Sequence, residues 1–172
     1  ALARRGVREV TLLGQSVMSY GRANPVWPPE APPGPGGFSE PFARLLEAVC
    51  ATPGILRVRF TSGHPSGCTP ELVRAVASLP QVCPHLHLPV QSGSDAVLGR
   101  MRRGYTRKDY LDAARRLRAA RPGFALTTDI IVGFPGETPE DFEATRSLMA
   151  EADFDNAFIF KYSARPGTPA AA

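Results

Sequence analysis

Hydrophobic positions along the chain follow two alternating periodicities. Five short segments are continuously apolar or apolar at every second position, as in β-strands: 7–13, 56–61, 85–90, 125–132 and 157–162. The segments between them carry apolar residues three and four positions apart, with predicted helices that begin near residues 41, 70, 95, 107 and 139. Strands that alternate with helices predict a parallel α/β sheet with right-handed crossovers. An open doubly wound sheet and an incomplete barrel both satisfy this pattern.

Residues that favour helix starts precede several of the predicted helices. Ser39 offers an N-cap with Pro41 in the first turn, and Ser94 precedes a short helix. Thr106 and Asp109 resemble a capping box, with Asp in the position usually held by Glu or Gln. These signals support the helical assignment of the intervening segments.

Two segments carry signals of their own. The apolar run that ends segment 125–132 predicts a strand buried on both faces. Residues 22–37 are rich in Pro and Gly, which excludes regular structure, and we expect a mobile excursion there.

Composition places the chain among ordinary globular proteins. The 172 residues amount to one domain, with 43% hydrophobic and 21% charged residues. The sequence lacks an apolar run long enough to span a membrane and an apolar signal-peptide core at its start, so we expect a cytoplasmic protein. Because it does not start with Met, we expect it to begin inside a longer protein. A net charge of +4 permits an RNA partner without requiring one.

The cysteines do not form a recognisable motif. Cys50, Cys68 and Cys83 have spacings that fit no disulfide framework and no zinc or iron–sulfur site. We expect Cys50 in the core, the other two in connections, and no metal site built from the three.

Polar residues and glycine gather where a ligand would bind in a parallel sheet. Ligands of parallel α/β folds lie at the carboxyl ends of the strands. The residues at or near these ends are Gln15, His64, Gln91, Ser92, Asp129 and Gly133. The sequence contains no phosphate-binding lysine loop and no Gly-x-Gly-x-x-Gly motif, which disfavours common nucleotide-binding folds.

Six ordered stretches carry a specific family resemblance. They are 12–15 (LLGQ), 60–65 (FTSGHP), 86–95 (LHLPVQSGSD), 101–106 (MRRGYT), 129–138 (DIIVGFPGET) and 162–170 (YSARPGTPA). Together they resemble the radical S-adenosylmethionine (SAM) tRNA methylthiotransferases, in particular the MiaB type. The resemblance covers nearly the whole chain except the Pro/Gly-rich insert at 22–37.

The resemblance implies a fold and a set of cofactors. The expected fold is α/β, an incomplete parallel (βα) barrel of the radical SAM type, or partial TIM barrel, with residues 1–172 forming part of that core. Members also have an N-terminal methylthiotransferase domain, a Cys-x-x-x-Cys-x-x-Cys cluster loop and a C-terminal TRAM domain, all absent from this sequence. SAM and two [4Fe–4S] clusters are the implied cofactors, with the cluster ligands outside this chain. We therefore assign no catalytic or metal-binding residue here and expect these residues alone to be inactive.

The implied reaction is methylthiolation of adenine C2 in N6-isopentenyladenosine beside the tRNA anticodon. In this family a cluster cleaves SAM reductively, and the resulting radical abstracts the C2 hydrogen before sulfur and a methyl group are added. The implied partners are the tRNA anticodon arm, SAM and an electron donor such as flavodoxin or ferredoxin, without a membrane, and we expect a monomer. Alternatives are the same chemistry on threonylcarbamoyl-adenosine tRNA or ribosomal protein S12, and a non-catalytic remnant that binds SAM or RNA.

The resemblance also implies roles at the two ends of SAM. Gln91 would contact its ribose, and Arg103 would hold its carboxylate in a bidentate contact. Ser92, next to Gln91, is a further candidate for cofactor binding. The alternative for Arg103 is a solvated cation at a helix end. We expect its neighbour Arg102 to point elsewhere.

Other positions carry weaker implications. Asp129 would bind the ribose hydroxyls, although a helix cap or an arginine could also be its partner. Gly133, in a loop that runs to Glu137, would let the backbone approach the adenine, or would serve only a strand-to-helix turn. Gln15 and Ser16 correspond to the site of the SAM amino group.

Three features depart from the family pattern or fit a structural explanation equally well. Met18 stands where usual members have Asn, and a thioether cannot replace that amide. His64 would line the substrate site, but a histidine before a proline is also typical of a turn. The basic run 102–121 could meet RNA phosphates or form a solvated helix face.

Overall fold

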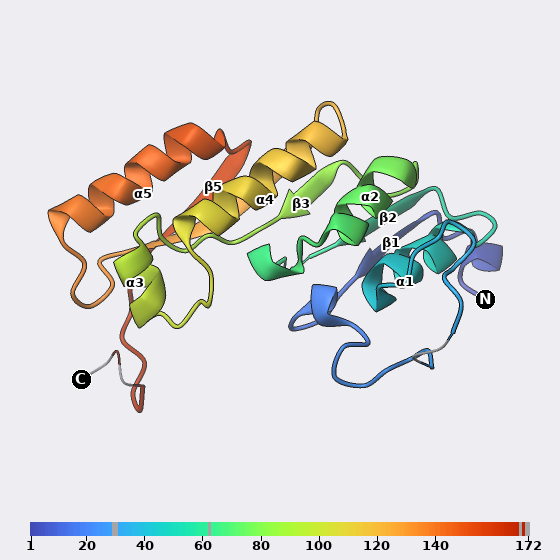
Figure 1. The fold of residues 1–172 in the computed structure, drawn as a ribbon, viewed down its shortest axis with the longest axis horizontal. Helices are drawn as coiled ribbons and strands as arrows, with labels where there is room; N and C mark the ends of the chain where they lie inside the picture. Colours follow the sequence, from blue (N-terminus) through green and yellow to red (C-terminus); the bar gives the residue numbers. More distant parts are fainter. Residues whose placement is uncertain (29–30, 62, 169, 171–172) are drawn as a thin grey trace.

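The computed structural model describes residues 1–28, 31–61, 63–168 and 170 (Figure 1). Residues 29–30 of the insert, Ser62 of motif 60–65 and Pro169 of motif 162–170 lie outside the described residues. The strands are β1 (Glu9–Leu12), β2 (Arg57–Phe60), β3 (His85–His87), β4 (Ala125–Val132) and β5 (Asn156–Lys161). The helices are α1 (Pro41–Cys50), α2 (Pro70–Ser78), α3 (Asp95–Arg100), α4 (Arg107–Ala120) and α5 (Pro139–Ala152). The short 3-10 turns are η1 (Ala3–Arg5), η2 (Val17–Ser19) and η3 (Pro65–Gly67).

The strands form parallel pairs in chain order. β1 pairs with β2, and β3, β4 and β5 form a second sheet in that order. A parallel bridge between Val58 and Val82 joins the two sheets, with the Val58 N–H donating to the Gln81 carbonyl at 2.8 Å. The carboxyl ends of all five strands therefore lie along one side. The predicted parallel α/β fold is confirmed, and within the described residues the array does not close into a barrel.

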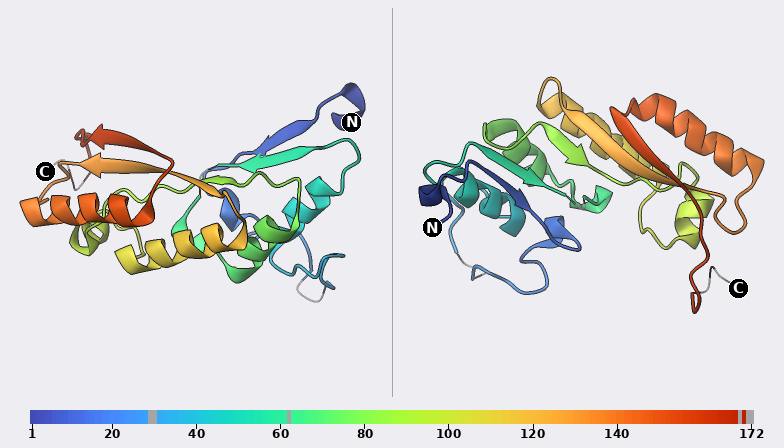
Figure 2. Two further views of the ribbon diagram at one scale, coloured as in Figure 1. Left: turned by 90° about the horizontal axis from the view of Figure 1, so that it is seen from above. Right: turned by 180° about the vertical axis from the view of Figure 1, so that it is seen from behind.

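Helices cover only one face of the strands (Figure 2). In β2, Val58 and Phe60 face the helices and are 0% and 3% exposed, as the alternating pattern predicted. In β4, Leu126, Thr128 and Ile130 are buried while the residues between them are only half-buried. The prediction that segment 125–132 is buried on both faces is therefore wrong. Its second face is part of the strand surface that the helices leave uncovered among the described residues, here called the open face.

Most helix starts follow the predicted capping. Thr106 and Asp109 form the reciprocal capping box, and the Ser94 hydroxyl accepts the Val97 N–H at 3.3 Å. The predicted N-cap at Ser39 is wrong, because α1 begins at Pro41 with Glu40 at the cap position. The backbone N–H groups of Ser39 and Glu40 donate instead to the Glu71 carboxylate, at 2.8 and 2.6 Å. A partner distant in sequence thus replaces the local cap.

β3 is shorter than predicted because Pro89 has no backbone N–H to donate. Beyond His87 the chain stays beside β4 through irregular hydrogen bonds. The Leu88 N–H donates to the Thr127 carbonyl at 2.8 Å, and the Val90 N–H donates to the Thr128 hydroxyl at 2.9 Å. A side chain therefore takes over part of the ladder where the proline interrupts it.

The described part of the insert, 22–28 and 31–37, contains no helix or strand, as predicted. Its end is nevertheless anchored. Arg74 donates to the carbonyls of Gly36 and Gly37 at 3.0 and 2.8 Å, and its guanidinium lies 4.3 Å from the ring centroid of Phe38. Phe38 is 1% exposed, so the insert closes over the core between α1 and α2.

The cysteines take the predicted places. Cys50 lies on the buried side of α1, while Cys68 and Cys83 lie in connections and are also buried. Burial raises the pKa of the Cys68 thiol to about 12. In the part of the chain that the structure describes, no helix has the length and apolar character needed to cross a membrane.

Two glycines provide a matched test of this packing. A Cβ at Gly93 would lie 2.4 Å from the Ala144 carbonyl oxygen and 2.6 Å from the Thr145 Cα, so Gly93→Ala must displace α5. We expect it to lower the free energy of unfolding by about 1–3 kcal/mol. Gly99, exposed within α3, has nothing within 4 Å of its Cβ position, and Gly99→Ala should add about 0.5–1 kcal/mol. Equal urea midpoints for the two variants would contradict the close approach at Gly93.

Candidate functional site

A cavity of about 700 Å³ opens at the carboxyl ends of β4 and β5. This volume lies in the usual range for small-molecule sites. Gln91, Arg103 and Asp129, chosen from the sequence, all line it. The other lining residues are Arg100, Met101, Arg102, Ile131, Phe134, Phe160, Lys161, Tyr162, Ser163, Arg165, Thr168 and Ala170. The structure thus brings together three predicted site residues from three separate segments.

Gln91 has a backbone conformation that side chains rarely adopt. Its φ is +70°, in the left-handed region, and it is only 7% exposed. Two backbone hydrogen bonds to β4, each 2.8 Å long, hold Gln91 there. The Gln91 N–H donates to the Asp129 carbonyl, and the Gln91 carbonyl accepts the Ile131 N–H. A strained residue held by its surroundings is typical of binding sites. The conformation fixes Gln91 in the cavity wall beside β4.

Arg103 carries a polar atom without a partner. Its Nε is buried and makes no hydrogen bond, and none of the ion pairs among the described residues includes Arg103. Its backbone N–H donates to the Leu98 carbonyl at 3.0 Å, which fixes it just after α3. A half-buried guanidinium with one buried, unsatisfied donor differs from a solvated helix-end cation and is suited to an anionic ligand.

The sequence had suggested that Arg102 points away from the site, and this prediction is wrong. It lines the same cavity as Arg103 and adopts a left-handed φ of +55°. Arg102 and Arg103, which are consecutive in the tight turn after α3, therefore both line the cavity. Arg102 therefore cannot serve as a remote control for Arg103.

Asp129 has a histidine as its partner, which differs from both structural alternatives considered for it. The His87 Nε2 lies 3.2 Å from Asp129 Oδ2, and the carboxylate side chain is 29% exposed. Neither a helix cap nor an arginine binds it among the described residues. Asp129 thus faces the cavity with one oxygen already engaged by the neighbouring strand.

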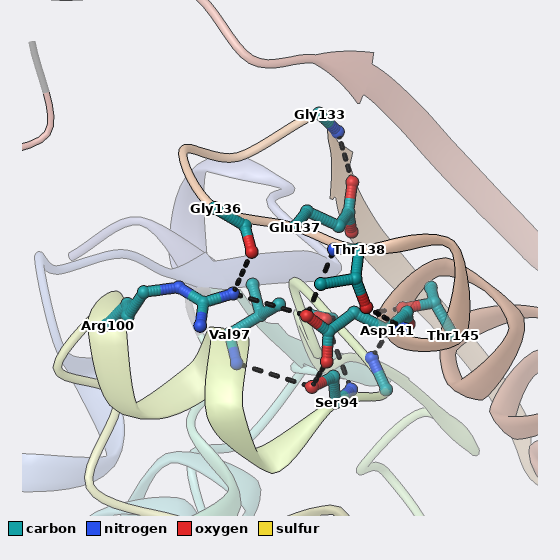
Figure 3. Close-up of polar contacts among 11 residues, drawn as sticks. Ser94, Val97, Arg100, Gly133, Gly136, Glu137, Thr138, Asp141 and Thr145 are labelled. Carbon is teal, nitrogen blue, oxygen red and sulfur yellow. Dashed lines mark hydrogen bonds and ion pairs between the residues drawn. The ribbon is translucent and has the colours of Figure 1, made fainter.

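The loop after β4 is held in place by a carboxylate on α5 (Figure 3). Asp141 accepts hydrogen bonds from the Ser94 hydroxyl, from the Thr138 N–H at 3.1 Å and from Arg100 at 3.3 Å. Arg100 also donates to the Gly136 carbonyl at 3.0 Å. One carboxylate therefore joins the start of α3, the start of α5 and the loop, and it fixes the helix that leads to Arg103.

Gly133 lies outside the set of residues that line the cavity, but it opens this loop. Its φ is +71°, and nothing lies within 4 Å of the position where a Cβ would be. Its N–H donates to the carboxylate of Glu137, the residue at the end of the same loop. The left-handed φ requires glycine for the turn, and the open space before it leaves room for a ligand.

Three other candidates lie away from the cavity. Gln15 and Ser16 are exposed after β1, and the Ser16 hydroxyl lies 2.8 Å from that of Ser19. Ser92 is fully buried with its hydroxyl 3.2 Å from that of Thr145, so its side chain does not face the cavity. Met18 is 1% exposed, which agrees with the expectation of no polar ligand role there.

His64 caps a turn. Its Nδ1 accepts the Ser66 N–H at 3.3 Å at the start of η3, and its ring packs edge-on against Tyr105 at 5.1 Å. Burial, and then the nearby Arg103 guanidinium, lower the pKa of His64. Its position favours the structural explanation, although it lies close to the arginine that lines the cavity.

The basic run 102–121 is largely engaged within the protein. Its side chains bind carboxylates or backbone carbonyls of neighbouring elements. The pairs are Arg107 with Glu151, Lys108 with Asp112, Arg115 with Asp112 and Glu151, Arg118 with Asp155, and Arg121 with the Val82 carbonyl. These contacts favour the structural explanation over a phosphate-binding surface. A second cavity of about 820 Å³ lies between η3 and α4, on the helical side.

Comparisons with known proteins agree with the fold. The model of the radical SAM superfamily matches residues 1–149. The chain belongs to the radical SAM superfamily. It is 54% identical over 170 residues to the tRNA-2-methylthio-N(6)-dimethylallyladenosine synthase of Akkermansia muciniphila, covering 99% of this chain and 35% of that protein. The protein of the same name from Anaeromyxobacter dehalogenans is 55% identical over 171 residues, covering 99% and 33%.

This radical SAM chain spans about a third of the length of the curated relatives it matches. In structure it is similar to an archaeal Elp3 from Methanocaldococcus infernus with an N-terminal deletion. The TM-score is 0.61 and the identity 16%, over 94% of this chain and 38% of that one. At this identity the likeness concerns the fold alone, and it supports the radical SAM type of α/β architecture.

Membership of the radical SAM superfamily implies SAM and iron–sulfur chemistry, and the cavity residues fit SAM. SAM carries a carboxylate, ribose hydroxyls and an adenine, and the cavity offers the unpartnered Arg103, the carboxylate of Asp129 and the amide of Gln91. The described residues do not fit a cluster, because they contain no group of three or more His, Cys, Asp or Glu placed to hold a metal.

Sequence reasoning missed several residues of the site. Lys161, the last residue of β5, and Tyr162 and Arg165 beyond it line the cavity. Tyr162 and Arg165 belong to motif 162–170 of the family resemblance, but their location on the cavity wall could not be read without the fold. Asp141 was recognised only as part of a helix start, and its long-range bonds to Ser94 carry no local signal.

The joint at Asp141 has a testable pH dependence. The Ser94 hydroxyl first, then the Thr138 backbone and Arg100, lower the pKa of Asp141 from its usual 3.8. Its stabilising contribution is therefore present above pH 3.8 and is lost as the pH falls through the lowered value. We expect Asp141→Asn to melt at a lower temperature than the parent at pH 7, with the gap narrowing toward pH 2.

Thermal melts across this pH range measure the gap. Glu143→Gln is the matched control, because Glu143 makes only an exposed pair with Arg146, and it should change the melting temperature little. A gap for Asp141→Asn that does not vary with pH would show that the carboxylate charge plays no part in the joint.

Proposed function

We propose that the cavity is a SAM site and that this chain forms part of the core of a tRNA methylthiotransferase. The observation that supports this most strongly is the meeting of Gln91, Arg103 and Asp129 in one cavity. Each belongs to a different motif of the family resemblance, and no single segment could bring the three together. The similarity to relatives named for this activity covers 99% of the chain.

Each cavity residue has a role that follows from its chemistry. Arg103 binds the carboxylate of SAM, because its buried Nε has no hydrogen-bond partner among the described residues. Asp129 accepts hydrogen bonds from the ribose hydroxyls, and the Gln91 amide bonds the same sugar. Together these residues orient SAM and help exclude water from it. SAM supplies the radical and methyl chemistry when bound.

The remaining site residues chosen from the sequence also have proposed roles. The loop from Gly133 offers backbone to the adenine, and its left-handed turn leaves open space for this approach. Gln15 and Ser16 approach the amino group of SAM only if the exposed segment after β1 folds toward the cavity. Ser92 and His64 act through packing, the first against α5 and the second by capping η3.

The whole protein's reaction is the methylthiolation of adenine C2 in N6-isopentenyladenosine next to the tRNA anticodon. This substrate assignment is supported by the name of the relatives, tRNA-2-methylthio-N(6)-dimethylallyladenosine synthase. Two [4Fe–4S] clusters, the anticodon arm of tRNA and an electron donor such as flavodoxin or ferredoxin complete the proposal. Such an enzyme works in the cytoplasm, and we propose that it acts as a monomer.

A segment exchange tests the reaction. The matching third of the Akkermansia muciniphila relative is replaced by this chain, and the hybrid is expressed in bacteria that lack this modification. Mass spectrometry of tRNA nucleosides should detect 2-methylthio-N6-isopentenyladenosine. Methylthiolated threonylcarbamoyl-adenosine in the same digest, or methylthiolated S12 in mass spectrometry of the ribosomal proteins, would establish an alternative substrate. A folded, SAM-binding hybrid that yields no such product would support the non-catalytic alternative.

Arg103 tests the cofactor site. Arg103→Ala should weaken SAM binding by about 1.5–3 kcal/mol, or roughly ten- to a hundredfold, because one charge-assisted contact is lost. Arg103→Lys should restore binding only in part, since an ammonium cannot form the bidentate contact. SAM titration by calorimetry of the purified protein measures the dissociation constants.

The control for this titration is Arg146→Ala. Arg146 lies on α5, and its ion pair among the described residues is with the exposed Glu143. It does not line the cavity. Arg146→Ala should bind SAM as the parent does. Equal SAM affinity in Arg103→Ala and Arg146→Ala would remove Arg103 from the site.

A further inference from the structure

Four polar side chains form a continuous hydrogen-bonded row on the open face of β3 and β4. His85 Nε2 lies 3.2 Å from the Thr127 hydroxyl, and His87 Nδ1 lies 2.9 Å from the same oxygen. His87 Nε2 then lies 3.2 Å from Asp129 Oδ2. The strand register explains the row, because His85 and His87 lie opposite Ala125 and Thr127 on the same face as Asp129. We call these residues, His85, Thr127, His87 and Asp129, the open-face relay.

For a neutral His87, the inventory of donors fixes the direction of the relay. An ionised carboxylate only accepts, so His87 Nε2 must carry the proton that it shares with Asp129. The Nδ1 of a neutral His87 is then an acceptor and takes the single hydroxyl proton of Thr127. The Thr127 oxygen in turn accepts the N–H of His85 Nε2. Every contact is satisfied with both histidines neutral and Asp129 charged.

The surroundings support neutrality at the start of the relay. Burial lowers the pKa of His85, and the nearby Arg59 guanidinium lowers it further. Phe158, which lies opposite Asp129 on β5, packs edge-on against His87 with the ring centroids 6.2 Å apart. The imidazole is thus restrained by an aromatic ring as well as by its two hydrogen bonds.

Only one member of the relay reaches the cavity. Asp129 lines the cavity wall, whereas His85, Thr127 and His87 are absent from the lining. His87 therefore acts on any ligand through Asp129. Its N–H engages Oδ2 and so leaves Oδ1 as the carboxylate oxygen available to the cavity. A partner of this kind restricts the rotamer of the Asp129 side chain.

We propose that His87 is a positioning residue. The Thr127 hydroxyl sets the tautomer of His87, whose Nε2–H then holds the carboxylate of Asp129 toward the ribose hydroxyls of SAM. The existence of the relay stands on its own distances. The effect on SAM rests on the proposed function of the cavity. The two parts are therefore tested by different measurements.

Nitrogen NMR of histidine tests the relay without any ligand. In protein labelled with ¹⁵N at histidine, His87 should show a protonated Nε2 and an unprotonated Nδ1 at pH 8. Thr127→Val removes the hydroxyl donor with little change in side-chain size, and the Nδ1 resonance should move toward the value of an unbonded nitrogen. A His87 that is protonated at Nδ1 in the parent, or unaffected in Thr127→Val, would overturn the relay.

SAM titration tests the positioning role. His87→Leu should weaken SAM binding about tenfold, because Asp129 loses the donor that orients it. His87→Gln retains an amide N–H that can reach the carboxylate, and binding should stay within about threefold of the parent. Thermal melts accompany each titration, and His87→Gln keeps the test decisive if His87→Leu fails to fold. A folded His87→Gln that binds as weakly as Asp129→Ala would refute a role through this donated hydrogen bond.

Asp129→Ala and Arg103→Ala separate the two proposals. If both bind SAM as tightly as the parent, the cavity is not the SAM site and the proposed function fails. If both bind weakly while a folded His87→Leu binds as the parent does, the SAM site stands and the positioning role of His87 is wrong. Weak binding by His87→Leu, rescued by His87→Gln, supports both.

Discussion

The parallel pairing of segment 85–91 with β4 is the interaction on which the cavity depends. It survives the missing N–H of Pro89 because the Thr128 hydroxyl accepts the Val90 N–H and donates to the Leu88 carbonyl, both at 2.9 Å. Backbone bonds then resume at Gln91, whose left-handed φ turns the chain toward α3. This arrangement sets Gln91 beside Asp129 and leads the chain on to Arg103. Loss of the pairing would separate all three.

The absence of helices over the second face of the strands gives that face a different chemistry. On the helical side the strands contribute Val, Leu, Ile and Phe to the core. On the open face Glu9 pairs with Arg57 and Arg59, and the relay of His85, Thr127, His87 and Asp129 continues the polar surface toward the cavity. Polar groups on this face satisfy one another, as semi-buried groups require. The same alternation that builds the core therefore also supplies the polar wall.

Local sequence signals predicted the elements well, because their causes are local. The capping box at Thr106 and the alternation in β2 depend on residues a few positions apart. The errors arose where a distant partner decides the outcome. Glu71 replaces the expected cap at Ser39. The second face of β4, which an apolar run had suggested to be buried, is only half-buried because no helix covers it among the described residues. Among site residues, the motifs predicted Gln91, Arg103 and Asp129, but neither the pairing of Asp129 with His87 nor the joint at Asp141 has a local pattern.

The central claim is that SAM binds in the cavity at the ends of β4 and β5. Two-dimensional ¹H–¹⁵N NMR of the purified protein during SAM titration measures this most directly. The account predicts saturable shifts of the backbone amides of Gln91, Arg103 and Gly133. The amides of residues that line the second cavity, between η3 and α4, such as Ser66 and Arg116, should not shift. Shifts confined to the second cavity, or no saturable shift at the SAM cavity in a folded protein, would contradict the account.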